Sequence, residues 1–286
     1  MHRLTIGLIA AIFIITDIAN AQQPGGDADL RVRVGAAPPI HNWSGFYIGG
    51  NVGYGWGHAH SDPTATISAI GSGLNTGNNR ITSNGASTST SLNGLLGGAQ
   101  AGYNWQLGSW VYGLEGDIQA TGQSGDGLFA TSALLGAVIN GVVATGTLIN
   151  TTTYKLPWFG TFRGRIGYAA DRWLVYATGG LAFGEISAES TTALGFSAGV
   201  GIPPPAQSLS SREVRAGWVI GAGVEAAFAT NWSLKVEYLH LDFGSIGQSF
   251  STPAVPSAFA SISASGNLHA RLSDDIGRIG VNYKFR

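Results

Sequence analysis

Apolar and polar side chains alternate with a period of two residues through most of the chain after about residue 43. In the first such segment Phe46, Val52 and Trp56 fall on one face, and Tyr47 and Asn51 fall on the other. Successive side chains of a strand point to opposite faces, so this pattern predicts a β-strand with one apolar face. The pattern recurs in eight segments, at about 46–56, 92–105, 110–119, 158–168, 173–184, 217–228, 234–238 and 278–285. The sequence therefore predicts an all-β protein.

All eight tryptophans fall at the ends of these segments, and the connections between segments alternate between short and long. At the short connections lie Trp43, Trp105, Trp110, Trp173 and Trp232, and at the long ones lie Trp56, Trp158 and Trp218. Two aromatic belts, with short turns on one side and long loops on the other, are typical of outer-membrane barrels. Backbone groups in hydrocarbon must all be paired, so such strands close into a ring.

We therefore expect an eight-stranded antiparallel up-and-down transmembrane β-barrel with short periplasmic turns and four long extracellular loops. The expected loops are rich in Ser, Thr, Gly, Asn and Ala, a composition that suits exposed surface. They cover about 58–91, 122–156, 185–214 and 244–268.

One stretch competes with this interpretation, because 128–149 carries no charge and hydropathy alone would favour a transmembrane helix there. At its centre stands Asn140-Gly141, a strong hairpin signal, between Ala137-Val138-Ile139 and Val142-Val143-Ala144. A hairpin is the better prediction. A ten-stranded barrel stays open as an alternative if this hairpin enters the membrane.

Charged residues within the eight segments fall on the face opposite the aromatics, which is the lumen of the predicted barrel. They are Glu115, Asp117, Arg163, Arg165, Glu225, Lys235, Glu237, Arg278 and Lys284. Buried charges are tolerated when they are paired. We expect one ladder between the third and fourth segments and another joining the sixth, seventh and eighth. Eight strands leave an interior that side chains can fill, so a structural plug is favoured over an ion path or a narrow solute pore.

The amino terminus predicts export. Residues 1–21 contain a basic start at Arg3, an apolar run and the small-residue site Ala19-Asn20-Ala21, as in a signal peptide. Residues 22–42 are expected to form a flexible periplasmic lead-in, and 43–286 the barrel. The predicted location is the outer membrane, after export through the inner membrane.

The composition excludes several kinds of functional site. The 286 residues include 44 Gly, no Cys and only 11% charged residues. The missing cysteines exclude disulfides, thiol catalysis and Cys-based metal sites. With 15 Lys and Arg against 16 Asp and Glu, no basic excess exists to bind nucleic acid. No cofactor is predicted.

Two histidine groups are candidates for chemistry. His58 and His60 in the first long loop form a weak candidate metal or haem site, since imidazole suits transition metals but no third ligand accompanies them. His240 with Asp242, together with His269, suggests a lipid-modifying hydrolase, yet no serine can be singled out as its nucleophile. We expect no enzyme. Binding of haem or a host ligand through the loops stays open as a third function, after the structural barrel and the narrow pore.

The segment from Trp43 to Trp56 resembles the alphaproteobacterial outer-membrane immunogenic protein family, small opacity-type barrels related to the outer-membrane protein A transmembrane domain. Other matching pieces are 160–168, 176–182, 234–238 and 280–285. The resemblance implies a porin-like surface antigen of Gram-negative cells that supports envelope integrity, with no catalytic residues.

The implied partners are outer-membrane lipid and lipopolysaccharide, host surface ligands and the barrel-assembly machinery. The assembly machinery would read Tyr283 and Phe285. The family usually ends on that aromatic residue, whereas Arg286 follows Phe285 here, which bears on the efficiency of insertion.

Overall fold

A computed structural model describes residues 41–70, 79–84, 88–139, 142–196, 206–252, 255–256 and 261–285. The chain divides into two units, Met1–Pro38 and Pro39–Arg286, and every described residue belongs to the second. The expected signal peptide, most of the expected lead-in and Arg286 lie outside the described residues.

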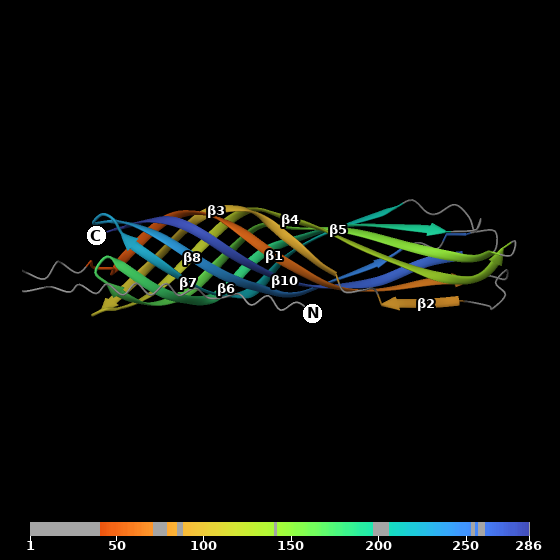
Figure 1. Ribbon diagram of the computed structural model, residues 1–286, viewed down its shortest axis with the longest axis horizontal. Helices are drawn as coiled ribbons and strands as arrows, with labels where there is room; N and C mark the ends of the chain where they lie inside the picture. Colours follow the sequence, from red (N-terminus) through yellow and green to blue (C-terminus); the bar gives the residue numbers. More distant parts are fainter. Residues whose placement is uncertain are drawn as a thin grey trace, which may run out of the picture. The chain divides into compact units, whose positions relative to one another are not determined.

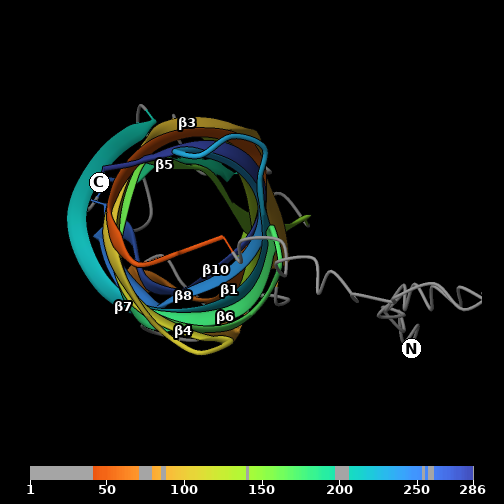
Figure 2. The same cartoon turned by 90° about the vertical axis from the view of Figure 1, so that its left-hand side faces the viewer.

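The described residues form ten β-strands, eight of which close into an antiparallel ring (Figures 1 and 2). The ring is closed because β1 pairs with both β3 and β10, while β2 adds to β1 and β9 adds to β10. The strands are β1 (Gly45–Ile70), β2 (Asn79–Asn84), β3 (Thr88–Leu107), β4 (Trp110–Ile139), β5 (Val142–Ala170), β6 (Trp173–Phe196), β7 (Gln207–Ala227), β8 (Trp232–Ser251), β9 (Val255–Pro256) and β10 (Ser261–Lys284). The eight-stranded barrel predicted from the sequence is confirmed. In the part of the chain that the structure describes, no helix is long and apolar enough to cross a membrane.

Short turns join the strands at one end of the ring. Gly108, with φ of 63°, lies between β3 and β4, and Asp171, with φ of 51°, lies between β5 and β6. Both residues adopt the left-handed region, which glycine enters freely and aspartate tolerates better than most residues. These are the short connections that the sequence predicted.

The strands continue far into the ranges expected to be loops. In the β4–β5 pair the ladder runs on from Ala120↔Trp158 to Ile139↔Val142, side by side in Figure 1. Most of the ranges expected as long loops are therefore paired hairpins that extend the strands of the ring. Thr has a high strand propensity, so threonine-rich segments can continue a ladder without a regular alternation of apolar and polar side chains. Asn140 and Gly141 lie outside the described residues, but the strands that flank them pair as a hairpin, and the ring keeps eight strands.

Beyond Trp218↔Asp242, the ring is interrupted between β7 and β8. Here β8 forms a bulge against β10, where the register shifts between Arg271 and Ser273, and Gly244 adopts a φ of 71°. The Asp242 carboxylate accepts hydrogen bonds from the Gly244 N–H at 2.8 Å and from Arg271 at 2.6 Å. Past this bulge, residues 207–217 of β7 pair only with β6 among the described residues.

Aromatic side chains form the two belts on the outer wall. Six tryptophans are exposed outside the ring, namely Trp56, Trp105, Trp110, Trp173, Trp218 and Trp232, and Trp158 is half-buried. Trp43 was wrongly placed in the belt, because only 3% of it is exposed and it packs inside the ring. It precedes β1, so strand alternation does not govern its direction. Gly45, with φ of 132°, turns the chain there.

Candidate functional site

Six charged side chains meet inside the ring and form the candidate site. Arg163 of β5 lies at the centre, bonded to Glu115, 2.8 Å from Asp117 and 3.2 Å from Glu237. The other two cations also bridge strands, since Lys235 lies 3.0 Å from Glu115 and Arg278 lies 2.5 Å from Glu237 and 3.1 Å from Asp117. None of these six side chains is more than 2% exposed. We call this set, Glu115, Asp117, Arg163, Lys235, Glu237 and Arg278, the ion cluster.

A fourth cation and a fourth anion adjoin the ion cluster on the side of the short turns. Arg165 lies 3.3 Å from Glu225 and 3.6 Å from Glu115. Its guanidinium also sits over the rings of Tyr47, at 4.7 Å, and Tyr176, at 5.3 Å. Cation–π contacts of this kind stabilise a desolvated arginine. Four acids and four bases are therefore enclosed together, without net formal charge.

The sequence predicted two separate ladders, and this was wrong, because the structure forms one network. Arg163 and Lys235 each contact acids from both expected groups. The reason is the width of an eight-stranded ring, which lets long side chains from opposite walls meet. Lys284 does not join the network. It is half-buried at the end of β10, and its ammonium donates to the Asn42 carbonyl.

Apolar layers lie on both sides of the ion cluster. On the side of the long hairpins, the interior is filled by a cluster that includes Leu96, Phe159, Val219, Leu239 and Ile276. On the side of the short turns, Trp43 packs with Val111, Ala169, Leu174, Tyr176 and Ala227. Inward residues of β5 show the order of these layers along the barrel. Ala169 lies in the apolar layer near the short turns, Arg165 and Arg163 lie among the charges, and Phe159 lies in the apolar layer near the long hairpins.

Trp43 belongs to a segment that crosses inside the ring at the end where the short turns lie. Figure 2 shows the first described residues, in orange, crossing inside the strands. The Trp43 N–H donates to the Gln106 side chain at 2.7 Å, and its carbonyl accepts from Asn104 at 3.3 Å. The Gln106 N–H in turn donates to Ser44 Oγ at 2.9 Å. We call residues 41–44 the stopper, and side chains rather than a strand ladder hold it.

Several inward polar groups were missed from the sequence. Asp274 is 2% exposed and accepts a hydrogen bond from Gln123 at 2.8 Å. Gln100 links Asn51, at 2.9 Å, to Asn282, at 2.6 Å, across three strands. Continuing the two-residue alternation of the last segment back from Arg278 would have placed Asp274 inside. An uncharged amide such as Gln123 gives no comparable signal.

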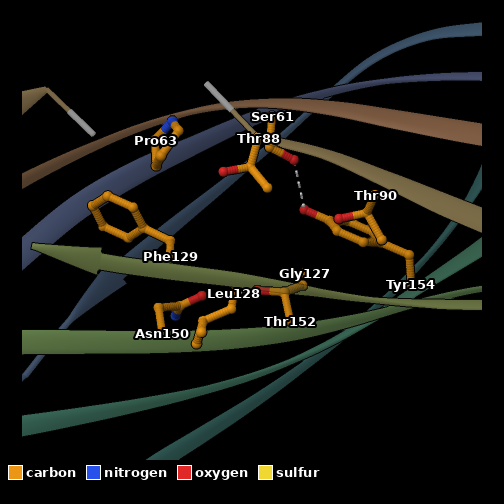
Figure 3. A pocket seen from close by; sticks show the side chains of 10 residues that line it. All are labelled: Ser61, Pro63, Thr88, Thr90, Gly127, Leu128, Phe129, Asn150, Thr152 and Tyr154. Atoms are coloured by element: carbon orange, nitrogen blue, oxygen red, sulfur yellow. Dashed lines mark hydrogen bonds between the residues drawn. The ribbon is translucent and has the colours of Figure 1, made fainter. Parts of the chain in front are cut away.

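A small cavity lies between the long hairpins (Figure 3). Its walls include Ser61, Phe129, Asn150 and Tyr154, and the Ser61 and Tyr154 hydroxyls lie 3.3 Å apart. Burial raises the pKa of Tyr154 above its usual value. The cavity measures about 20 Å³, which holds roughly one water molecule. It is too small to bind an organic ligand.

The histidine candidates are not brought together. His58 and His60 are exposed on β1, and His60 Nε2 lies 3.7 Å from Asp62. His240 contacts Asp275 at 2.8 Å rather than Asp242, which is bonded to Arg271. Among the described residues no three His, Cys, Asp or Glu side chains gather closely enough to hold a metal ion.

Residues 32–285 match the family model described as outer membrane protein beta-barrel domain. The 31 kDa outer-membrane immunogenic protein of Brucella melitensis is 32% identical over the full length of both chains. The 22 kDa outer membrane protein of Rhizobium leguminosarum is 29% identical, over 86% of this chain and 87% of its own. Among solved structures, OprG of Pseudomonas aeruginosa is 11% identical, with a TM-score of 0.35, over 86% of this chain and 99% of that one.

Proposed function

Because the chain belongs to the outer membrane protein β-barrel domain family, we propose that it is a structural barrel with a closed lumen that supports the outer membrane and presents its long hairpins at the cell surface. Membership confirms the family resemblance and the outer-membrane location that the sequence predicted. The closed lumen and the support of the envelope are our proposal.

The observation that carries the proposal is the neutral ion cluster enclosed between apolar layers. A conducting path needs a continuous polar wall, and here cations and anions from opposite walls contact one another. Separating them would expose unpaired charges in a low-dielectric interior, which costs several kcal/mol for each ion. A resident, hydrated ion path is therefore disfavoured.

Planar bilayer recording tests the closed lumen. The wild-type barrel is expected to give no stable conductance. Arg163→Ala removes the central cation and leaves Glu115, Asp117 and Glu237 without it, so brief openings are expected to appear. The narrow porin would be established instead if the wild-type chain gave a large, stable conductance and Arg163→Ala changed the ion selectivity of that conductance.

Support of the envelope is tested separately in cells. A deletion strain is expected to become more sensitive to detergent with EDTA, and a wild-type copy should restore resistance. A copy truncated in the β4–β5 hairpin between Gly127 and Thr152, which are paired in the ladder, should also restore it, because the barrel below is intact. Restoration only by the full-length hairpin would assign the function to the surface instead.

A further inference from the structure

A group of polar and aromatic side chains lies on the outer wall of β8 and β10, at the level of the extracellular tryptophans. Asp275 accepts a hydrogen bond from the Tyr238 hydroxyl at 2.5 Å and contacts His240 Nδ1 at 2.8 Å. The Trp56 ring lies 6.4 Å from that of Tyr238, and the Trp218 ring lies 5.5 Å from that of His240. We call Trp56, Trp218, Tyr238, His240 and Asp275 the wall cluster.

The wall cluster is accessible from outside the barrel. The side chains of His240 and Asp275 are 33% and 25% exposed, and the three large aromatic residues are between 38% and 47% exposed. Asp275 stands opposite Trp56 on β1 and opposite His240 on β8, so rings flank it on both sides. Both of its contacts reach Oδ1, and among the described residues Oδ2 accepts no hydrogen bond.

The electrostatic balance of this wall is negative. The nearby Asp242 is neutralised by Arg271 at 2.6 Å. Within the described part of the chain, Asp275 has only His240 and the Tyr238 phenol as partners. With histidine counted as neutral, one carboxylate charge is left between aromatic rings. A carboxylate on the membrane-facing wall costs free energy, though less near the interface than at the midplane.

A carboxylate framed by aromatic rings is suited to an organic ammonium ion, which the ring faces and the negative charge attract together. A phosphate would instead be repelled by the Asp275 carboxylate. The position at a Trp and Tyr belt places the cluster at the depth of lipid headgroups. We propose that the wall cluster binds the ammonium headgroup of a membrane lipid, with Asp275 as the counter-ion and Trp56 and Trp218 as the flanking rings.

Native mass spectrometry of the full mature chain in detergent tests this site with phosphatidylcholine and phosphatidylglycerol as probes. Phosphatidylcholine is expected to bind about tenfold more tightly. Asp275→Asn should abolish that preference, and Trp56→Ala should weaken it severalfold. An equal affinity of the wild type for the two lipids would overturn the proposal.

Glu185→Gln is the matched control. Glu185 is also an acid on the outer wall and is 24% exposed. It accepts a hydrogen bond from the Trp158 indole at 3.2 Å, but unlike Asp275 it has a cation nearby, Arg212 at 4.0 Å. It should keep the full preference for phosphatidylcholine, and an equal loss in Glu185→Gln and Asp275→Asn would refute a specific site. Excess glycerophosphocholine should displace the bound lipid, whereas glycerophosphoglycerol should not. If neither displaces it, the headgroup is not what is recognised.

Discussion

Replacing Glu115 with Gln tests how far the ion cluster stabilises the fold. Glu115 contacts all four enclosed cations, since Lys235 lies 3.0 Å away, Arg278 3.5 Å and Arg165 3.6 Å, and Arg163 also bonds to it. Gln keeps the size of the side chain and removes its charge. The enclosed group of four acids and four bases then carries one uncompensated positive charge.

The magnitude follows from burial. Glu115 and Lys235 are 2% and 0% exposed, so solvent does not screen their charges. Removing one partner of a buried ion pair typically costs about 3–5 kcal/mol. The double variant Glu115→Gln, Lys235→Met removes both charges and restores neutrality, and it should cost less than the sum of its single variants by about 2–3 kcal/mol.

Equilibrium unfolding by denaturant in lipid vesicles, followed by tryptophan fluorescence, measures these free energies. Glu189→Gln is the matched control, because Glu189 pairs with Lys155 at 3.3 Å with both side chains about half exposed. It should cost no more than about 1 kcal/mol. If Glu115→Gln costs as little as this control, or if the two single costs simply add, the ion cluster is not the cooperative unit described above.

Three further predictions follow from the fold. Trp43→Ala should expose the periplasmic end of the lumen. A cysteine introduced by Val111→Cys, the sole thiol in this cysteine-free chain, should then react faster with a charged maleimide than it does when Trp43 is present. Equal rates would show that the stopper does not close the ring. Gly98→Ala should destabilise the barrel, because its Cβ would overlap the Ile118 carbonyl oxygen. Gly50→Ala should unfold like the wild type, because its Cβ would lie 3.8 Å from the nearest atom, the Gly98 carbonyl oxygen. Trypsin added to whole cells should cut after Arg212 before it cuts after Lys155. Arg212 is 73% exposed on the part of β7 that pairs only with β6 among the described residues, whereas the strand of Lys155 pairs with a neighbour on each side. The reverse order would indicate that the β7 edge is covered.

The sequence predicted the membrane-spanning part of the fold well, because lipid imposes a strict alternation on every strand there. Outward Phe46 and inward Tyr47 follow from that rule alone. Above the aromatic belt, water accepts either kind of side chain on the outer face, and buried polar residues such as Asn150 and Thr152 occupy the inner face, so the alternation is no longer strict. Segments such as 151–153 therefore gave no sign of a strand in the sequence, although the backbone ladder continues through them.

The candidate site was predicted in its composition and missed in its connectivity. Period-two alternation placed Glu115, Arg163 and Lys235 inside, but distances across a ring depend on its width and stagger, which no local pattern reports. The stopper was missed for a different reason. The direction of Trp43 depends on the turn at Gly45 and on the amides of Gln106 and Asn104, which are remote in sequence.

The length of the β4–β5 ladder has a consequence for evolution of the cell surface. From Ala120↔Trp158 to its tip it adds roughly 60 Å along the strands, at ~3.3 Å per residue. Hydrogen bonds between backbones hold this stretch, and they tolerate most side chains. Substitutions selected by an immune response can therefore accumulate at the tip without reaching the buried ions that stabilise the barrel, so that antigenic change and folding are decoupled.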